Sequence, residues 1–139
     1  MFPSLDISTS ALVAQRVRMN VISQNLANLS TTRNEEGEIA PYQKRQVFLQ
    51  TDEGVGTRGA SGVKVAAVEI DQSPPNYKWD PTNPDAIQKG EHQGYVAYPN
   101  VDMITEFTDA LAVARAYQAN VGAIEIAKDL AQQTLRILA

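Results

Sequence analysis

The first 30 residues place apolar side chains at the spacing of a helix. One stripe repeats every seven residues, at Leu5, Leu12, Met19 and Leu26. Ile22 lies at the neighbouring position of the same stripe. Residues three, four and seven apart share one face of an α-helix, so the pattern predicts an amphipathic helix. Hydroxyl residues at 30–32 compete for backbone hydrogen bonds, and we therefore expect this helix to occupy residues 1–32 and to end there.

A second, longer helical pattern occupies residues 101–139. Its apolar stripe includes Met103, Phe107, Ala110, Ala114, Tyr117, Val121, Ile124, Ala131 and Leu135. Asn100 follows a proline and has the side chain of an N-cap, and Asp102 would stand in the first turn. At 1.5 Å per residue, a helix over this whole segment would reach about 58 Å.

The two stripes predict an antiparallel coiled-coil hairpin made of the two ends of the chain. We expect six side chains to meet in it: Leu12, Met19, Leu26, Phe107, Tyr117 and Leu135. Each helix also carries a second apolar line. These lines are Val13, Val17 and Val21 on the first helix, and Ile104, Leu111, Ile126, Leu130 and Ile137 on the last. Two helices cannot bury four stripes, so the middle of the chain or other subunits must cover the rest.

Amides stand on these helices where a solvated face usually carries charges. They include Asn20, Gln24, Asn25, Asn28, Gln118 and Asn120. Amides can pair across a buried contact without the desolvation cost of charges. We therefore expect Asn25 and Asn28 to bond across a helix or subunit contact, with Gln118 and Asn120 on the facing helix. This pattern indicates contact between molecules.

The middle, residues 33–100, contains most of the turn-forming residues. Residues 41–50 and 62–71 alternate like strands and predict a β-hairpin with a bulge at Ala66–Ala67. The link at 51–61 is rich in glycine and predicts a flexible connection. Residues 72–100 carry five prolines among tyrosines and one tryptophan, and we expect an extended loop without regular structure. The predicted fold is mainly α, with a small β-hairpin and an extended-loop middle, and its parts 1–32, 33–100 and 101–139 form one structural unit.

Composition and charge narrow the classes of function. The net charge of -4 is mild and spread along the chain, which argues against a nucleic-acid partner. There are no cysteines, so disulfides and cysteine zinc sites are excluded. No apolar run is long enough to cross a bilayer, and we expect no direct membrane insertion. The first residues lack the pattern of a Sec-type leader, so any export is expected to use another route.

Candidate catalytic chemistry is sparse. His92 is the single histidine and has no second ligand at a metal-binding spacing. The glycine-rich stretch "GVGTRGASG" lacks the Lys-Ser/Thr ending of a phosphate-binding loop. Asp80, Asp85 and Glu91 could cluster, but Asp and Asn beside Pro are ordinary in turns. We expect no enzyme activity, no metal and no cofactor.

Four stretches together resemble a known family. They are "SQNLANLSTTRNEEGEIAPYQKRQ", "GVKVAAVEIDQSPPNYKWDPTNPDA", "GYVAYPNVDMITE" and "ARAYQANVGAIEIAKDLAQQTL". In this order they resemble the rod and hook axial proteins of the bacterial flagellar basal body, across nearly the whole chain. Many axial relatives run from the asparagine-rich helix end directly into Thr-Pro-Gly-Tyr. Here "STTRNEEGEIAPY" delays Pro41 and Tyr42, which is similar to the proximal-rod variant.

The resemblance implies a structural subunit that is not an enzyme. It implies that the subunit pairs its terminal helices and packs with its own copies and with sister rod proteins around a central export channel. It also implies export by the flagellar type III apparatus without a cleaved signal, and a place in the rod that crosses the periplasm and transmits torque. The side chains expected at contacts with partners are Leu12, Met19, Ile22, Gln24, Asn25, Leu26, Asn28, Tyr98, Asn100, Phe107, Tyr117, Gln118, Asn120, Val121, Ile124 and Leu135.

Alternative functions remain at this point. The chain could be another rod or hook axial protein, or a monomeric helical-hairpin binding module of the type III export system. An enzyme that uses the middle carboxylates is the third class. The pattern of apolar and amide side chains favours the structural subunit.

Overall fold

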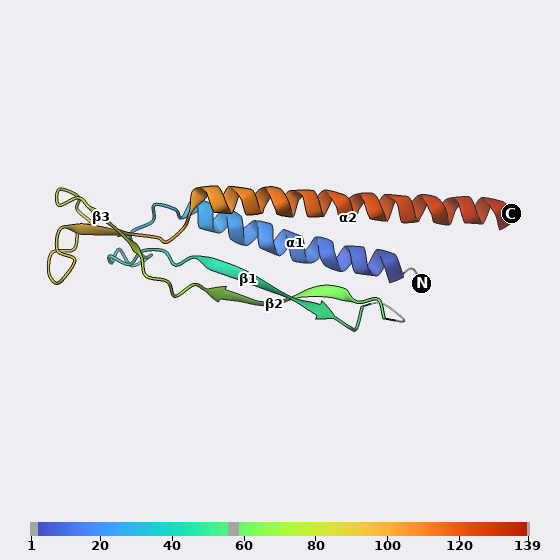
Figure 1. Ribbon diagram of the computed structural model, residues 1–139, viewed down its shortest axis with the longest axis horizontal. Coiled ribbons are helices and arrows are strands. Elements are labelled where there is room, and N and C mark those ends of the chain that lie inside the picture. Colours follow the sequence, from blue (N-terminus) through green and yellow to red (C-terminus); the bar gives the residue numbers. More distant parts are fainter. Residues whose placement is uncertain (1–2, 56–58, 139) are drawn as a thin grey trace.

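The computed structural model describes residues 3–55 and 59–138, which form an elongated body (Figure 1). Two long helices lie antiparallel: α1 (Pro3–Ala27) and α2 (Met103–Leu138). A ribbon of two strands, β1 (Arg45–Asp52) and β2 (Gly62–Ile70), lies along the other side of α1. The short strands β3 (Asn76–Trp79) and β4 (Tyr95–Tyr98) form the end of the molecule that is remote from both termini.

The N-terminal helix α1 is covered on two sides. It contacts α2 on one side and both strands of the β1–β2 ribbon on the other, whereas α2 contacts α1 alone among the described helices and strands. This arrangement explains why α1 carries two apolar lines, since Val21 and Ile22 are both buried. The ribbon approaches α1 closely at Gly62, where the Ser10 hydroxyl accepts a hydrogen bond of 3.1 Å from the Val63 amide.

The β1–β2 ribbon is the hairpin that the alternating pattern predicts. Its antiparallel register pairs Arg45 with Ile70 and Asp52 with Gly62. The register shifts between Phe48 and Leu49, so that Ala66 has no partner in β1. The predicted bulge is therefore confirmed. The flexible link expected at 51–61 includes residues 56–58, which lie outside the described residues.

The predicted fold class is wrong in the middle region, because the chain has a second antiparallel sheet. Strand β3 pairs with β4 from Asn76 opposite Tyr98 to Trp79 opposite Tyr95, within the segment expected to be an irregular loop. Aromatic and β-branched residues favour this pairing, and Val96 and Ala97 of β4 are buried. The prolines that argued against regular structure lie before β3, in the β3–β4 loop and after β4, where they interrupt no ladder.

The start of α2 also differs from the sequence prediction. Asp102, not Asn100, is the residue before the helix, and its carboxylate accepts hydrogen bonds from the amides of Ile104 and Thr105, both at 3.3 Å. Asn100 instead accepts a side-chain bond of 3.3 Å from Asn76. The N-cap is therefore two residues later than predicted. The intervening Val101 is buried and lies in the connection between β4 and α2.

The most buried apolar residues of the two helices are small or medium-sized. Ala14 of α1 and Val113 of α2 are almost fully buried. Phe107, Tyr117 and Leu135, which were expected in this contact, are all exposed. Phe107 points outward because Glu106 and Val113 occupy the inward face at this end of α2, whereas Leu135 lies beyond the beginning of α1.

Candidate assembly surface

Large apolar side chains lie on the face of α2 that points away from α1. Ile104, Phe107 and Leu111 are 77%, 59% and 53% exposed and are spaced three and four residues apart. This spacing puts them on one side of the helix, opposite the buried Val113. Large apolar side chains that cluster at a surface mark an interaction site more often than single ones do.

The last turns of α2 extend past the beginning of α1 (Figure 1). Asn25 of α1 contacts Glu106 of α2, and α1 begins 22 residues before Asn25. In an antiparallel pair, α2 therefore passes the level of Pro3 at about residue 128. The exposed apolar side chains of this distal part are Ile126, Leu130, Leu135 and Ile137. Among the described elements, no other helix or strand covers this part of α2.

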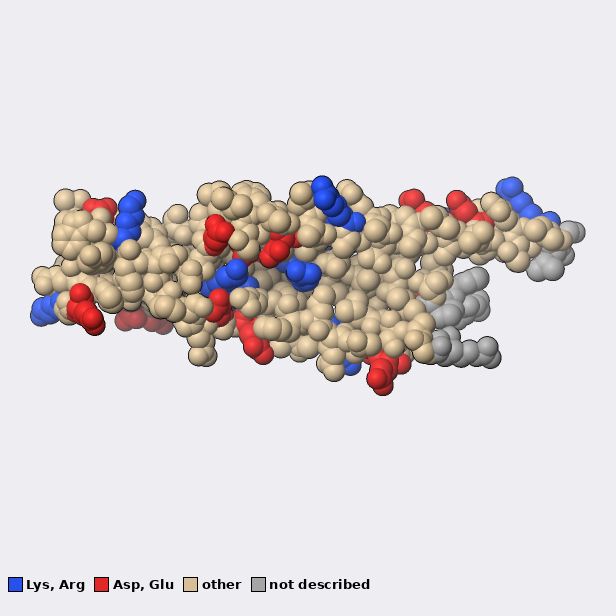
Figure 2. Space-filling model, in the orientation of Figure 1, with Lys and Arg blue, Asp and Glu red and all other residues tan. Residues whose placement is uncertain are grey.

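Charge is not the feature that organises this surface. On the face shown in Figure 2, Lys, Arg, Asp and Glu are scattered, and no large area carries one sign of charge. The apolar side chains of α2 are therefore the most distinctive feature available for a partner. No helix in the described part of the chain is both long and apolar enough to cross a membrane.

The predicted contact residues on α1 lie mostly inside the subunit. Ile22 and Asn25 are buried, and Leu12, Met19 and Leu26 are half-buried. Gln24 is exposed at the end of the helix. Asn28 is half-buried and donates a bond of 2.9 Å to the Gln24 carbonyl, so it finishes its own helix instead of bonding across a contact.

The predicted contact residues on α2 divide between its two faces. Val121 and Ile124 are half-buried toward α1, whereas Gln118 is exposed. Asn120 donates a bond of 2.8 Å to the Ala116 carbonyl of its own helix. Of the four amides expected to bond across a contact, only Asn25 does so within the described part of the subunit.

Asn25 joins three elements through its side chain. Its Nδ2 donates to the Arg45 carbonyl at 2.9 Å and to Glu106 Oε2 at 3.2 Å. Its Oδ1 accepts from the Arg45 amide and from the Tyr42 hydroxyl, both at 3.0 Å. Lys44 Nζ completes the group with an ion pair of 2.7 Å to Glu106 Oε1. We call Asn25, Tyr42, Lys44, Arg45 and Glu106 the polar node.

The centre of the polar node is buried, whereas Tyr42 and Lys44 are half-buried and Arg45 is exposed. Glu106 is 2% exposed and Asn25 is 1% exposed. Burial raises the pKa of the Tyr42 hydroxyl; the nearby Arg45 lowers this pKa and Glu106 raises it further. Tyr42 therefore remains protonated at neutral pH and can donate to Asn25.

Sequence reasoning found Asn25 but missed Glu106, Lys44 and Tyr42. The sequence does contain an indication of Glu106. The small residues of α2 at 110, 113 and 114 mark the face that packs closely, and Glu106 lies on that same face of the helix. The prediction followed the large apolar residues, and it therefore put Phe107 on the inward face of α2 and Glu106 on the outward face. Lys44 and Tyr42 carried no periodic signal, because they lie before β1 in irregular chain.

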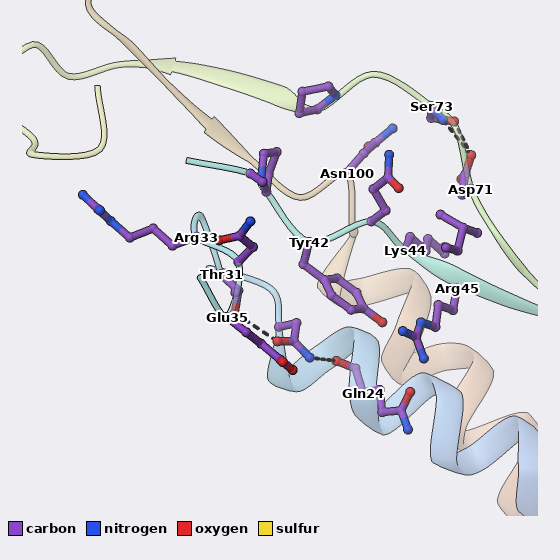
Figure 3. Close-up of a pocket in the computed structure, with 17 residues that line it drawn as sticks. Gln24, Thr31, Arg33, Glu35, Tyr42, Lys44, Arg45, Asp71, Ser73 and Asn100 are labelled. Atoms are coloured by element: carbon purple, nitrogen blue, oxygen red, sulfur yellow. Dashed lines mark hydrogen bonds between the residues drawn. The ribbon is translucent and has the colours of Figure 1, made fainter. Parts of the chain in front are cut away.

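An open groove of about 780 Å³ lies beside the polar node (Figure 3). It brings together three predicted contact residues: Gln24, Asn28 and Asn100. Figure 3 shows Gln24 on the end of α1, with Tyr42, Lys44 and Arg45 on the chain that leads into β1. Side chains of both charge signs line the groove, so it does not select a ligand of one charge.

The other side chains considered as catalytic or metal-binding candidates take part in stacking and in hydrogen bonds that support the fold. His92 stacks on Tyr77 with ring centroids 3.9 Å apart. Asp80 accepts a bond of 2.8 Å from the Thr82 hydroxyl in a turn, as its sequence context predicts. Asp85 instead receives bonds from Thr32 and Arg33, which hold its pKa below its usual value. In residues 3–55 and 59–138, His, Asp and Glu form no group of three suited to a metal ion.

Tyr98, the last predicted contact residue, is half-buried in β4 opposite Asn76. Together, the elongated shape, the polar node with its buried centre and the uncovered apolar face of α2 are typical of a structural subunit.

Comparisons with known proteins agree with this class. Residues 5–33 match the family model described as flagella basal body rod protein, and residues 92–137 match flagellar basal body rod FlgEFG protein C-terminal. The chain is 42% identical to the flagellar basal-body rod protein FlgC of Bacillus subtilis, over 98% of this chain and 97% of that protein. It is 36% identical to FlgC of Borreliella burgdorferi, over 99% and 97% of the two chains. With FlgC of Salmonella typhimurium the identity is 38%, over 95% and 93%.

The chain therefore belongs to the FlgC family of flagellar basal-body rod proteins. The two family models match segments that contain most of α1 and of α2. Residues 34–91, which contain β1, β2 and β3, lie outside both matches.

Proposed function

We propose that this rod subunit joins its neighbours through the outward face and the distal turns of α2. The observation that carries the proposal is the exposed apolar line of Ile104, Phe107 and Leu111, which no described element covers. Burying such side chains contributes about 1.5–3 kcal/mol each, which favours a covered state. Repetition in every subunit would give a continuous apolar contact along the rod.

The predicted contact residues take two roles in this proposal. Phe107, Tyr117, Gln118 and Leu135 are exposed and would touch neighbouring chains directly. The buried and half-buried members, such as Ile22 and Asn25, would act indirectly by holding α2 in place. The segments 1–32, 33–100 and 101–139 would act as one structural unit, which the bonds of the polar node support.

The neighbours would be copies of this chain and sister rod proteins. The names of the relatives, which are basal-body rod proteins, support this choice of partner and a role without catalysis. As the family resemblance implies, the assembled rod would cross the periplasm, enclose an export channel and transmit torque. The subunit would reach its place through the flagellar type III apparatus without losing a signal peptide.

The proposal is tested with Phe107→Asp in cells that assemble flagella. A carboxylate buried against a neighbour without a partner costs several kcal/mol, so we expect basal bodies without complete rods. The isolated variant should keep its helical circular dichroism, because Phe107 is exposed in the subunit. Detection of the chain outside the cytoplasm separates failed export from failed assembly.

Ala112→Asp is the matched control, since Ala112 is an exposed residue of α2 that lies off the apolar line. It adds the same charge to the same helix and should leave rods largely intact. Normal rods in the Phe107→Asp cells would contradict the proposed contact. Equal loss of rods in both variants would show that the helix, not this face, is what assembly requires. A Phe107→Asp phenotype confined to export would favour a binding module of the export system.

A further inference from the structure

The polar node is an unusual feature of the contact between α1 and α2. Among the described residues, Glu106 is the largest side chain that is almost fully buried, and the apolar Val113 two turns along α2 is buried as deeply. Its two carboxylate oxygens are held separately, one by Lys44 and the other by Asn25. A buried carboxylate loses its hydration, so this position requires both partners.

Asn25 has no free bonding position left for another partner. Two of its four bonds go to the amide and carbonyl of Arg45, the first residue of β1, and one goes to Tyr42. The side chain thus occupies the free edge of β1 in the way that a neighbouring strand would. Only the remaining Nδ2 hydrogen reaches α2, and Glu106 accepts it.

Apolar packing alone defines the register of α2 only weakly. Four alanines are half-buried along the part of α2 that lies beside α1: Ala110, Ala114, Ala116 and Ala127. Because alanines are alike in size and shape, sliding α2 by one or two turns exchanges one small residue for another. A slide of one turn would bring Ala110 to the position of Glu106, and a slide of two turns would bring Val113 there. Neither side chain can accept a bond from Lys44 or Asn25.

A buried ion pair is poor evidence for stability, because desolvation offsets much of the attraction between the charges. A single polar position in an apolar helix contact can nevertheless fix register, since every other register leaves buried groups unpaired. The polar node thus lowers the free energy of the observed register relative to the shifted ones.

We propose that Lys44, Asn25 and Glu106 set the register of α2 against α1 and the β1–β2 ribbon. In this proposal they act as positioning residues within the subunit. The node fixes how far α2 extends past α1 and at which height Ile104, Phe107 and Leu111 are presented. The register itself is a property of the single chain; its consequence for assembly rests on the proposed function.

The test measures register in the isolated full-length chain. Because the chain contains no cysteine, Thr9→Cys on α1 and Thr108→Cys on α2 provide two unique positions for spin labels. Both residues are exposed and lie at different heights along the helix pair. A slide of one helical turn moves α2 by about 5.4 Å along its axis, which electron spin resonance resolves as a second distance.

The decisive variant is Lys44→Met with Glu106→Leu, which replaces the ion pair by apolar side chains and leaves the bonds of Asn25 to Arg45 in place. We expect the chain still to fold with a cooperative urea transition, because the gain from removing a buried ion pair offsets the loss of one acceptor for Asn25. The parent chain should give a single narrow distance between the two labels. In the variant we expect this distance distribution to broaden, or a second distance to appear that corresponds to a shift of α2 by one helical turn, about 5.4 Å along its axis.

Arg33→Met with Asp85→Leu is the matched control, because it removes an ion pair that lies outside the helix contact. It should leave the label distance unchanged. A single narrow distance at the parent value in the Lys44→Met, Glu106→Leu chain would overturn the proposal. Failure of that chain to fold would also overturn the proposal, because it would show that the node is needed for the stability of the fold and not only for the register of α2. Neither result would affect the test of the α2 face by Phe107→Asp.

Discussion

Identical side chains act differently in this subunit according to what surrounds them. Asn25 bonds to β1 and α2, whereas Asn28 and Asn120 bond to carbonyls of their own helices. Only Asn25 faces both a strand edge and a buried carboxylate. The role of an amide is thus decided by its neighbours in space.

Gly94 is a position where one methyl group should matter. Its φ is +83°, and a Cβ there would lie 2.5 Å from the Trp79 ring. We expect Gly94→Ala to lower the free energy of unfolding by more than the roughly 1–3 kcal/mol of a strained backbone, since the ring must also move. Urea unfolding followed by the fluorescence of Trp79, the single tryptophan, measures the change.

Gly37→Ala provides the control for backbone strain alone. Gly37 has a nearly identical φ of +82°, but nothing lies within 4 Å of its would-be Cβ. It should cost less than Gly94→Ala. If the two variants unfold at the same urea concentration, contact with Trp79 contributes nothing and the expectation is contradicted.

At the level of elements, side-chain bonds connect the chain after α1 to the β3–β4 loop. We call these bonds, from Thr32 and Arg33 to Asp85, the Asp85 tie. Arg33 and Thr32 both bond to Asp85, and Arg33 also donates a bond of 2.9 Å to the Gly37 carbonyl. An isolated bridge between Arg33 and Ile39 closes the intervening loop. The longer connection between the asparagine-rich helix end and Pro41 therefore has a defined conformation.

Acid should release this tie. Hydrogen bonds from Thr32 and Arg33 lower the pKa of Asp85 below its ordinary value of 3.8. A group whose pKa is lowered on folding stabilises the fold above its unfolded pKa, and this contribution is lost as pH falls through the folded pKa. We expect the amide chemical shifts of residues 32 and 37 to change together below about pH 3.8.

Two variants separate Asp85 from other carboxylates. In Asp85→Asn the acid transition of these amides should be absent, because the tie is already weakened at neutral pH. In Asp80→Asn it should persist, since Asp80 bonds locally to Thr82. An unchanged transition in Asp85→Asn would assign the acid response to a different group.

The helix α2 consists of a supported part and a free part. The part before about residue 128 packs on α1, while the turns after it have no partner among the described elements. Isolated helical turns are marginal in water, so we expect fast amide exchange after residue 128 in the free subunit and slow exchange at 110–121. Slow exchange to the end of α2 in a proven monomer would contradict this view of the distal turns.

At the scale of the whole molecule, the subunit exposes more surface than a compact protein of its size. Its accessible surface is 9766 Å², whereas a compact monomer of this mass exposes about 7,100 Å². The excess exceeds the roughly 1,600 Å² of a standard protein–protein interface. An elongated shape with uncovered apolar side chains is therefore a whole-molecule property that agrees with a subunit made for assembly.

Elements that depend on neighbours along the chain could be predicted from the amino-acid sequence alone. Helical spacing predicted both terminal helices, and alternation predicted the β1–β2 hairpin with its bulge near Ala66. These patterns are readable because each repeats with the period of its own secondary structure. The resemblance to rod proteins likewise rested on stretches of contiguous residues.

The buried face of each helix and the contacts between distant residues depend on how the elements pack together. Rotation of α2 by about one residue puts Glu106 inward and Phe107 outward, and both phases satisfy a helical period. The β3–β4 pairing joins residues that are distant in the sequence, from Trp79 with Tyr95 to Asn76 with Tyr98, and no local pattern sets its register. The polar node depends on residues 20 and 81 positions apart in the chain, so it exists only where packing brings those side chains within hydrogen-bonding distance.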